Sequence, residues 1–179
     1  MTVETDRLIL RDWRESDIEP FIRDLNVEPV MRWLGGVRTP EQQRAAVRER
    51  FMAWQEERGF TFWAVERKSD GDLLGFCGLK IADDPESPVE GEYEVGWRFR
   101  EEAWGQGYAK EAAIASLDFA FDRLGAERVV ALTVEGNSPS WGLMIRLGMT
   151  RRPDLDYATA QWADGTVIVY EVRREQWRS

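Results

Sequence analysis

The residues best suited to chemistry lie in two neighbouring stretches, 92–99 and 104–109. The first carries Glu92 and Glu94, which share one face if the stretch is a strand, because residues i and i+2 point the same way. Two carboxylates on one face can accept protons if burial raises the pKa of one of them. The second, Trp104-Gly105-Gln106-Gly107-Tyr108-Ala109, is a glycine turn at a predicted helix start, where backbone N–H groups can bind an anion.

The neighbouring elements must position this turn. Val95, Trp97 and Phe99 are apolar at every second position and predict a strand. A predicted helix follows directly, with one apolar face formed by Ala109, Ala113, Leu117, Ala120 and Leu124. The macrodipole adds positive charge at the helix start, and glycines let a phosphate approach the backbone. The chain has no P-loop string, and Lys110 stands where a dinucleotide fingerprint needs its third glycine. Two interpretations remain: the turn binds the pyrophosphate of coenzyme A, or it is a structural turn that binds no ligand.

A longer string narrows this choice. Residues 104–112, WGQGYAKEA, resemble the acetyl-CoA loop of the GNAT N-acetyltransferases, most closely in the branch of the ribosomal-protein acetyltransferases RimJ and RimL. The opening RLILR at 7–11 and the pattern Asn137-x-x-Ser140 before Leu147-Gly148-Met149 are similar to the same branch. The resemblance covers nearly the whole chain. It implies one GNAT domain over 1–179, with an α/β (α+β) fold: a mixed, mostly antiparallel sheet flanked by helices and splayed at the cofactor strands.

The resemblance also implies a cofactor site for acetyl-CoA, the acyl donor. The backbone of Trp97 and Phe99 would bind the pantetheine arm, and Asn137 and Ser140 would lie beside it. The N–H groups that would bind the pyrophosphate belong to Gly105, Gln106, Gly107, Tyr108 and Ala109.

Two positions depart from the family pattern. Trp104 stands where the family begins its loop with Arg or Gln, and Met144 stands where many members carry a tyrosine that protonates the leaving thiolate. Ser140 is the nearest hydroxyl on that helix. It is either the replacement acid or a first-turn serine bonded to the backbone.

The implied reaction is acetyl transfer to a primary amine by direct attack. Glu94 is the first choice as base, with Glu92 or a relayed water as alternatives, or the acidic face is merely solvated. The acceptor is a protein N-terminus or a small amine. The competing function is a non-catalytic acyl-CoA-binding sensor or scaffold, which the missing tyrosine allows.

Composition excludes other classes of function. The 179 residues include no histidine, so histidine-based catalysis and His-ligated metal sites are excluded, and no metal is expected. The net charge of −9 argues against nucleic acid and suits a cationic partner or simple solubility. The single Cys77 lies in an apolar run and predicts a buried thiol. No apolar stretch of membrane length and no signal-like N-terminus are found, which predicts a cytoplasmic protein. A homodimer is common in the resembling branch, and the sequence leaves the oligomeric state open.

The periodicity predicts further elements. Ser16 and Thr39 are candidate N-caps, Ser138 precedes Pro139 at another helix start, and Gly75 and Gly78 predict bulges or close backbone contacts. Strands are predicted at 7–13, 60–67, 73–82, 92–99, 128–134, 149–153 and 167–173, and helices at 16–26, 39–58, 108–124 and 138–147, with a turn at Asp164-Gly165. Four aromatic residues could line a pocket, although most are expected in the core: Trp33, Phe51, Trp54 and Trp63.

Overall fold

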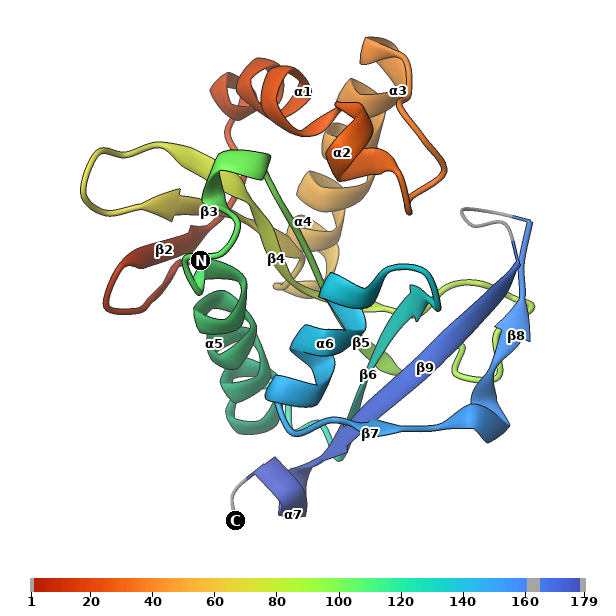
Figure 1. The fold of residues 1–179 in the computed structure, drawn as a ribbon. Helices are drawn as coiled ribbons and strands as arrows, with labels where there is room; N and C mark the ends of the chain where they lie inside the picture. The colour runs from red at the N-terminus through yellow and green to blue at the C-terminus, as the bar shows by residue number, and fades with distance from the viewer. Residues whose placement is uncertain (1, 161–164, 178–179) are drawn as a thin grey trace.

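A computed structural model describes residues 2–160 and 165–177 (Figure 1). One sheet of nine strands runs through these residues in the order β1-β2-β3-β4-β5-β6-β9-β7, with β8 also paired to β9. Only β5 and β6 pair in parallel; the other pairs are antiparallel. The strands are β1 (Thr2–Glu4), β2 (Leu8–Arg11), β3 (Phe62–Arg67), β4 (Leu73–Ile81), β5 (Tyr93–Phe99), β6 (Arg128–Val134), β7 (Thr150–Arg151), β8 (Tyr157–Ala158) and β9 (Thr166–Arg173).

The helices lie on both faces of this sheet. The α-helices are α1 (Ile18–Leu25), α2 (Glu28–Met31), α3 (Pro40–Ala45), α4 (Ala53–Arg58), α5 (Tyr108–Asp122), α6 (Ser138–Arg146) and α7 (Arg174–Trp177). A π-helical segment, η2 (Ala46–Met52), joins α3 to α4, and short 3-10 turns lie at Glu15–Asp17, Glu101–Ala103 and Pro153–Leu155. The predicted mixed, mostly antiparallel sheet flanked by helices is therefore confirmed.

Two apolar layers hold the helices against the sheet. On one face, α5 and α6 pack their buried stripes, including Leu117 and Met144, against Val95 and Phe99. On the other face, Phe21 of α1 and Phe51 of η2 pack against Phe62 and Phe76 of the sheet. Because successive strand residues face opposite layers, β5 contributes Val95 and Phe99 to the first layer and turns Glu94, Gly96 and Arg98 toward the second.

The predicted glycine contacts in β4 are confirmed. A Cβ on Gly75 would lie 2.0 Å from the carbonyl oxygen of Arg98, and one on Gly78 would lie 2.1 Å from that of Thr61. The register also shifts between Val65 and Glu66, opposite Gly75. Glycine is required at these positions because the neighbouring backbones leave no room for a side chain.

Several predicted boundaries need correction. The Ser16 cap is wrong: a 3-10 turn precedes α1, and the Asp17 carboxylate accepts the Arg14 N–H at 2.7 Å. At the start of α6, Asn137 occupies the cap position predicted for Ser138. The Thr39 capping box is confirmed. Strand β1 was not predicted. Part of the predicted turn at Asp164-Gly165 lies outside the described residues.

The parallel pair β5–β6 is short. Its register runs only through Tyr93 with Val129 and Glu94 with Val130. Beyond these pairs the rest of each strand bonds only to its antiparallel neighbour, so the sheet opens between Val95–Phe99 and Ala131–Val134. This opening exposes strand backbone to an inserted ligand, as the resemblance implied.

Candidate active site

A cleft of about 1260 Å³ occupies the opening between β5 and β6. Its walls combine Gly96 and Trp97 of β5, Leu132 and Thr133 of β6, the turn before α5, and the start of α6. On the other side, the segment between α2 and α3 and the π-helical η2 complete it. The cleft thus passes from one layer of the fold to the other, which suits a site that joins two substrates.

The glycine turn forms one end of the cleft. Gly105 and Gly107 both have positive φ, 72° and 79°, which favours glycine at these positions. Within the described residues, the N–H groups of Gly105, Gln106 and Gly107 donate to no protein acceptor. Tyr108 begins α5 directly afterwards. The turn therefore offers unpaired donors at the positive end of a fifteen-residue helix, an arrangement that binds phosphate groups.

Arg7 braces this turn from the neighbouring loop. Its guanidinium donates to the carbonyl oxygen of Gln106 at 2.9 Å, forms an ion pair with Glu111 at 2.7 Å, and lies 4.5 Å from the ring centre of Tyr108. The opening motif at 7–11 therefore holds the turn in place, a role that sequence reasoning had not assigned.

Trp104, the departure from the family pattern, has a structural partner. Its indole Nε1 donates to the carbonyl oxygen of Phe99 at 2.9 Å, while its ring stays 49% exposed beside the cleft. This bond occupies the backbone carbonyl oxygen of Phe99. The N–H and C=O groups of Trp97 are therefore the main candidates for backbone hydrogen bonds to a pantetheine arm.

The start of α6 faces the same cleft. Asn137, Ser140 and Met144 all contribute to its lining. Met144 is only 1% exposed, so the position that often carries a tyrosine acid is filled by a buried thioether. Ser140 is half-buried, and Tyr157 of β8 brings a second hydroxyl to the cleft. Sequence reasoning missed Tyr157 because it lies in a short strand within a polar connection.

Glu94 lies in the cleft on the opposite side of β5. Its carboxylate is 13% exposed, and Lys80, its cross-strand neighbour, places Nζ 3.5 Å from Oε2. Burial raises the pKa of Glu94, and Asp83 adds to the increase, while Lys80 and Arg50 oppose it. Apart from this long ion pair with Lys80, Oε2 has no hydrogen-bond partner among the described residues. A largely buried carboxylate with a raised pKa is suited to proton abstraction.

Glu92 lies elsewhere. It precedes β5, binds Arg128 at 2.6 Å, and does not line the cleft. The like charge that acts on the pKa of Glu94 comes from Asp83 instead. The structure thus gives Glu94 other charged neighbours than the expected Glu92: Asp83, which adds to its raised pKa, and Lys80, with which it forms an ion pair.

Basic residues of the cleft were also missed. Arg38, Arg50 and Arg98 line it together with Lys80. In the register of β4 and β5, Lys80 is paired with Glu94, and Arg98 is paired with Phe76. The sequence alone did not reveal this register.

The predicted roles of other residues divide clearly. Trp63 is fully buried and Trp54 nearly so, both as core residues, whereas Trp33 and Phe51 line the cleft. Cys77 is also fully buried, and burial raises the pKa of its thiol to about 12. This confirms a structural cysteine.

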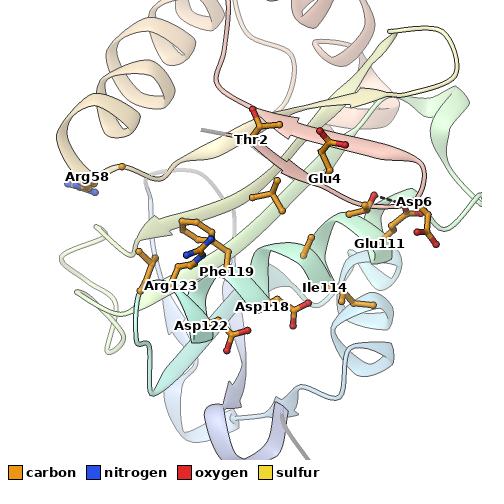
Figure 2. A pocket seen from close by; sticks show the side chains of 15 residues that line it. Thr2, Glu4, Asp6, Arg58, Glu111, Ile114, Asp118, Phe119, Asp122 and Arg123 are labelled. Atoms are coloured by element: carbon orange, nitrogen blue, oxygen red, sulfur yellow. Dashed lines mark hydrogen bonds between the residues drawn. The ribbon is translucent and has the colours of Figure 1, made fainter.

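A second depression lies between β1 and α5 (Figure 2). Its lining is mainly acidic, with Glu4, Glu111, Asp118 and Asp122, and it also includes the basic residues Arg58 and Arg123. It shares no lining residue with the cleft and contains none of the predicted site residues. The described residues contain no group of His, Cys, Asp and Glu side chains arranged to hold a metal ion. They also contain no helix that is long and apolar enough to cross a membrane.

The opened strand pair, the glycine turn and the cleft between them have the geometry of an acyltransferase site. The family model for the acetyltransferase (GNAT) domain matches residues 7–150, and the chain belongs to this family. It is similar to the uncharacterized N-acetyltransferase YoaA of Bacillus subtilis, with 27% identity over 151 residues that cover 83% of this chain and 82% of YoaA. The protein is accordingly an N-acetyltransferase.

Solved structures support the same fold. An acetyltransferase from Agrobacterium tumefaciens aligns with a TM-score of 0.80 and 26% identity, over 97% of this chain and 94% of that one. The ribosomal-protein-S5-alanine acetyltransferase of Vibrio fischeri aligns with a TM-score of 0.75 over the full length of both chains, at 16% identity. The second similarity shows the fold alone.

Proposed function

We propose that this protein transfers the acetyl group of acetyl-CoA to a primary amine by direct attack. The observation that carries the proposal is the placement of Glu94, a buried carboxylate with a raised pKa, in the same cleft as the unpaired N–H groups of the turn at 105–107. The turn would bind the pyrophosphate, the opened strands would hold the pantetheine arm, and Glu94 would meet the amine.

The proposed steps balance. An amine is protonated at neutral pH, so Glu94 first takes a proton from it, directly or through water. The amine nitrogen then attacks the thioester carbon, and a backbone N–H of β5 near Trp97 stabilises the oxyanion. Collapse of the tetrahedral intermediate breaks the C–S bond, and the attacking nitrogen loses its second proton, which leaves an amide and the coenzyme A thiolate. That proton passes to the thiolate through the hydroxyl of Ser140 or Tyr157 or through water, so the relaying hydroxyl ends neutral. The proton on Glu94 returns to solvent.

The finer assignments belong to the same proposal. We place the chain in the RimJ/RimL branch because of its motifs at 7–11, 104–112 and 137–149. The acceptor is a protein N-terminus or a small amine. We further propose that residues 1–179 form one domain, since one sheet runs through the described residues, and that the protein is cytoplasmic.

An acetyl-transfer assay tests the proposal. Purified protein is incubated with acetyl-CoA and a panel of peptides and small amines, and thiol release and amide formation are measured together. Transfer to at least one amine is expected, with acetyl-CoA preferred over bulkier acyl donors. Tight binding of acetyl-CoA without transfer to any amine would instead favour the sensor or scaffold function.

A further inference from the structure

The charge of the cleft is opposite to that of the chain. The protein carries a net charge of −9, yet seven basic and only four acidic side chains line the cleft. Lys110 and Arg146 belong to α5 and α6, on the side assigned to the cofactor. The other five basic residues are on the acceptor side, at Arg32, Arg38, Arg50, Lys80 and Arg98.

Arg98 is the most unusual of these cations. Its guanidinium lies 5.1 Å from the ring centre of Phe76 and 5.8 Å from that of Phe21. Among the described residues, no carboxylate forms an ion pair with it, and its buried Nε has no hydrogen-bond partner. Arg100, two residues further along, also has a buried Nε without a hydrogen-bond partner, but it forms ion pairs with Asp72 at 3.0 Å and with Asp24 at 3.9 Å. The lack of a carboxylate partner among the described residues therefore distinguishes Arg98 from Arg100.

The surroundings of Arg98 add positive charge. Burial, together with the charges of Arg38 and Arg50, lowers the pKa of Arg98 to about 9, so it remains a cation at neutral pH. The nearest carboxylate of Arg50 is Asp83, at 3.9 Å, and the guanidinium of Arg38 forms no ion pair within the described part of the chain. Three guanidinium groups that repel one another in a partly desolvated cleft are unfavourable unless an anion enters.

The cofactor does not account for this anion. The turn at 105–107 precedes α5, which packs on the face of Val95 and Phe99. Arg98 instead contacts Phe21 and Phe76, which belong to the opposite layer, the one that also receives Glu94. The cationic group and the proposed base therefore share the acceptor side of the strand.

We propose that the acceptor amine carries an oxyanion, a carboxylate or a phosphate, which binds Arg98, Arg38 and Arg50 while the amine faces Glu94. This inference rests on the proposed function and specifies its substrate class. Arg98 is a specificity residue here: a planar guanidinium can form paired hydrogen bonds to such a group.

The spacing along β5 adds a length requirement. Glu94 and Arg98 are four residues apart on one strand face, which separates their Cα atoms by about 13 Å. Phe62 lies between them, since a Cβ on Gly96 would meet its ring at 2.7 Å. The amine and the oxyanion of the acceptor are therefore separated by several bonds, which a simple α-amino acid does not provide.

Matched amines test the inference. Acetyl transfer to 6-aminohexanoate is compared with transfer to 6-amino-1-hexanol, its uncharged counterpart, and to glycine and 6-aminohexyl phosphate. The wild-type protein should favour the two long anionic amines over 6-amino-1-hexanol by about tenfold or more in kcat/KM. This is the effect of one charge-assisted hydrogen-bonded pair. Similar results for carboxylate and phosphate would show that charge governs recognition, and a difference would identify the preferred group.

Two variants of Arg98 and one control assign the preference. Arg98→Met retains an unbranched side chain that packs against Phe21 and Phe76, and it should bring the ratio of kcat/KM for 6-aminohexanoate to that for 6-amino-1-hexanol close to unity. Arg98→Lys should retain part of the preference. Arg100→Met, outside the cleft on the same segment, should retain all of it. Thermal melts of each variant identify any that fail to fold.

Equal use of charged and uncharged amines by the wild-type protein would overturn the inference, as would an undiminished preference in a folded Arg98→Met variant. If no amine is acetylated, the proposed function fails, and calorimetry then decides the inference separately. In that case 6-aminohexanoate should still bind more tightly than 6-amino-1-hexanol to the wild-type protein, and equally weakly to Arg98→Met; any other pattern would contradict it.

Discussion

At the scale of single residues, Glu94 carries the sharpest prediction. Glu94→Gln removes the proton acceptor but preserves the shape of the side chain. It should lower kcat by about 10²–10⁴-fold, the usual contribution of a positioned base, with little change in the KM for acetyl-CoA. Glu90→Gln, an exposed carboxylate in the preceding loop, is a matched control and should behave as wild type. Unchanged turnover in Glu94→Gln would remove Glu94 as the base.

The pH profile gives the same residue a second readout. Burial raises the pKa of Glu94, so its carboxylate becomes protonated at a higher pH than that of free glutamate. The pKa of free glutamate is about 4.3. Only the ionised form accepts a proton, so kcat/KM should fall as the pH decreases through this raised pKa. Glu94→Gln should lose this acidic limb, whereas a limb that persists in the variant would belong to another group.

Residue types indicated the site only in part. Glu94 and the turn at 104–109 could be found because both belong to one continuous strand-turn-helix segment. Lys80, Arg50 and Arg98 could not, since their proximity depends on the β4–β5 register and on where η2 crosses the sheet. The net charge suited a cationic partner or simple solubility and gave no sign of a basic cleft, because the charge of a whole chain does not report its local distribution.

At the scale of elements, the close contact between β4 and β5 is open to a direct test. Gly75 has a φ of 150°, and a Cβ there would lie 2.0 Å from the carbonyl oxygen of Arg98. Gly75→Ala must displace one of the two strands and should cost about 2–3 kcal/mol, a loss of about 5–10 °C in Tm. Thermal unfolding followed by circular dichroism measures it.

Gly142 provides the comparison for this substitution. It lies inside α6, and a Cβ there would meet only the flexible end of Arg146, at 3.4 Å. Gly142→Ala should therefore be neutral or stabilise the protein by about 0.5–1 kcal/mol, because alanine loses less backbone entropy in a helix than glycine. Equal destabilisation by both substitutions would contradict the steric account of Gly75.

Most long elements followed from periodicity, whereas short ones did not. The helices at 108–122 and 138–146 and the strands at 73–81 and 128–134 have apolar patterns long enough to read. Strand β1 has three residues and exists through its pairing with β2, which no local pattern records. The Ser16 cap failed because a 3-10 turn forms at Glu15–Asp17, in which the Asp17 carboxylate accepts the Arg14 N–H and also binds the buried Arg11. Such tertiary contacts outweigh the local sequence signals for caps and short strands.

At the scale of the whole molecule, the sheet is open between its two halves. The two halves, β1 to β5 and β6 to β9, are joined by only two residue pairs in parallel register. A coenzyme A arm inserted between β5 and β6 would bond to backbone groups on the open edges and link the halves. The ligand should therefore stabilise the folded state as well as supply the acyl group.

Thermal denaturation with acetyl-CoA measures this link. At a concentration of 100 Kd the ligand should add about 2.7 kcal/mol of stability, which raises Tm by about 5–10 °C for a chain of this size. ATP and NAD, which share the adenosine pyrophosphate but lack the pantetheine arm, should produce a much smaller shift. Gly107→Glu places a carboxylate at the turn and should abolish the shift with acetyl-CoA, measured against its own unliganded Tm. Equal shifts with all three ligands would show that the turn binds pyrophosphate without engaging the opened strands, and an undiminished shift in Gly107→Glu would place the cofactor elsewhere.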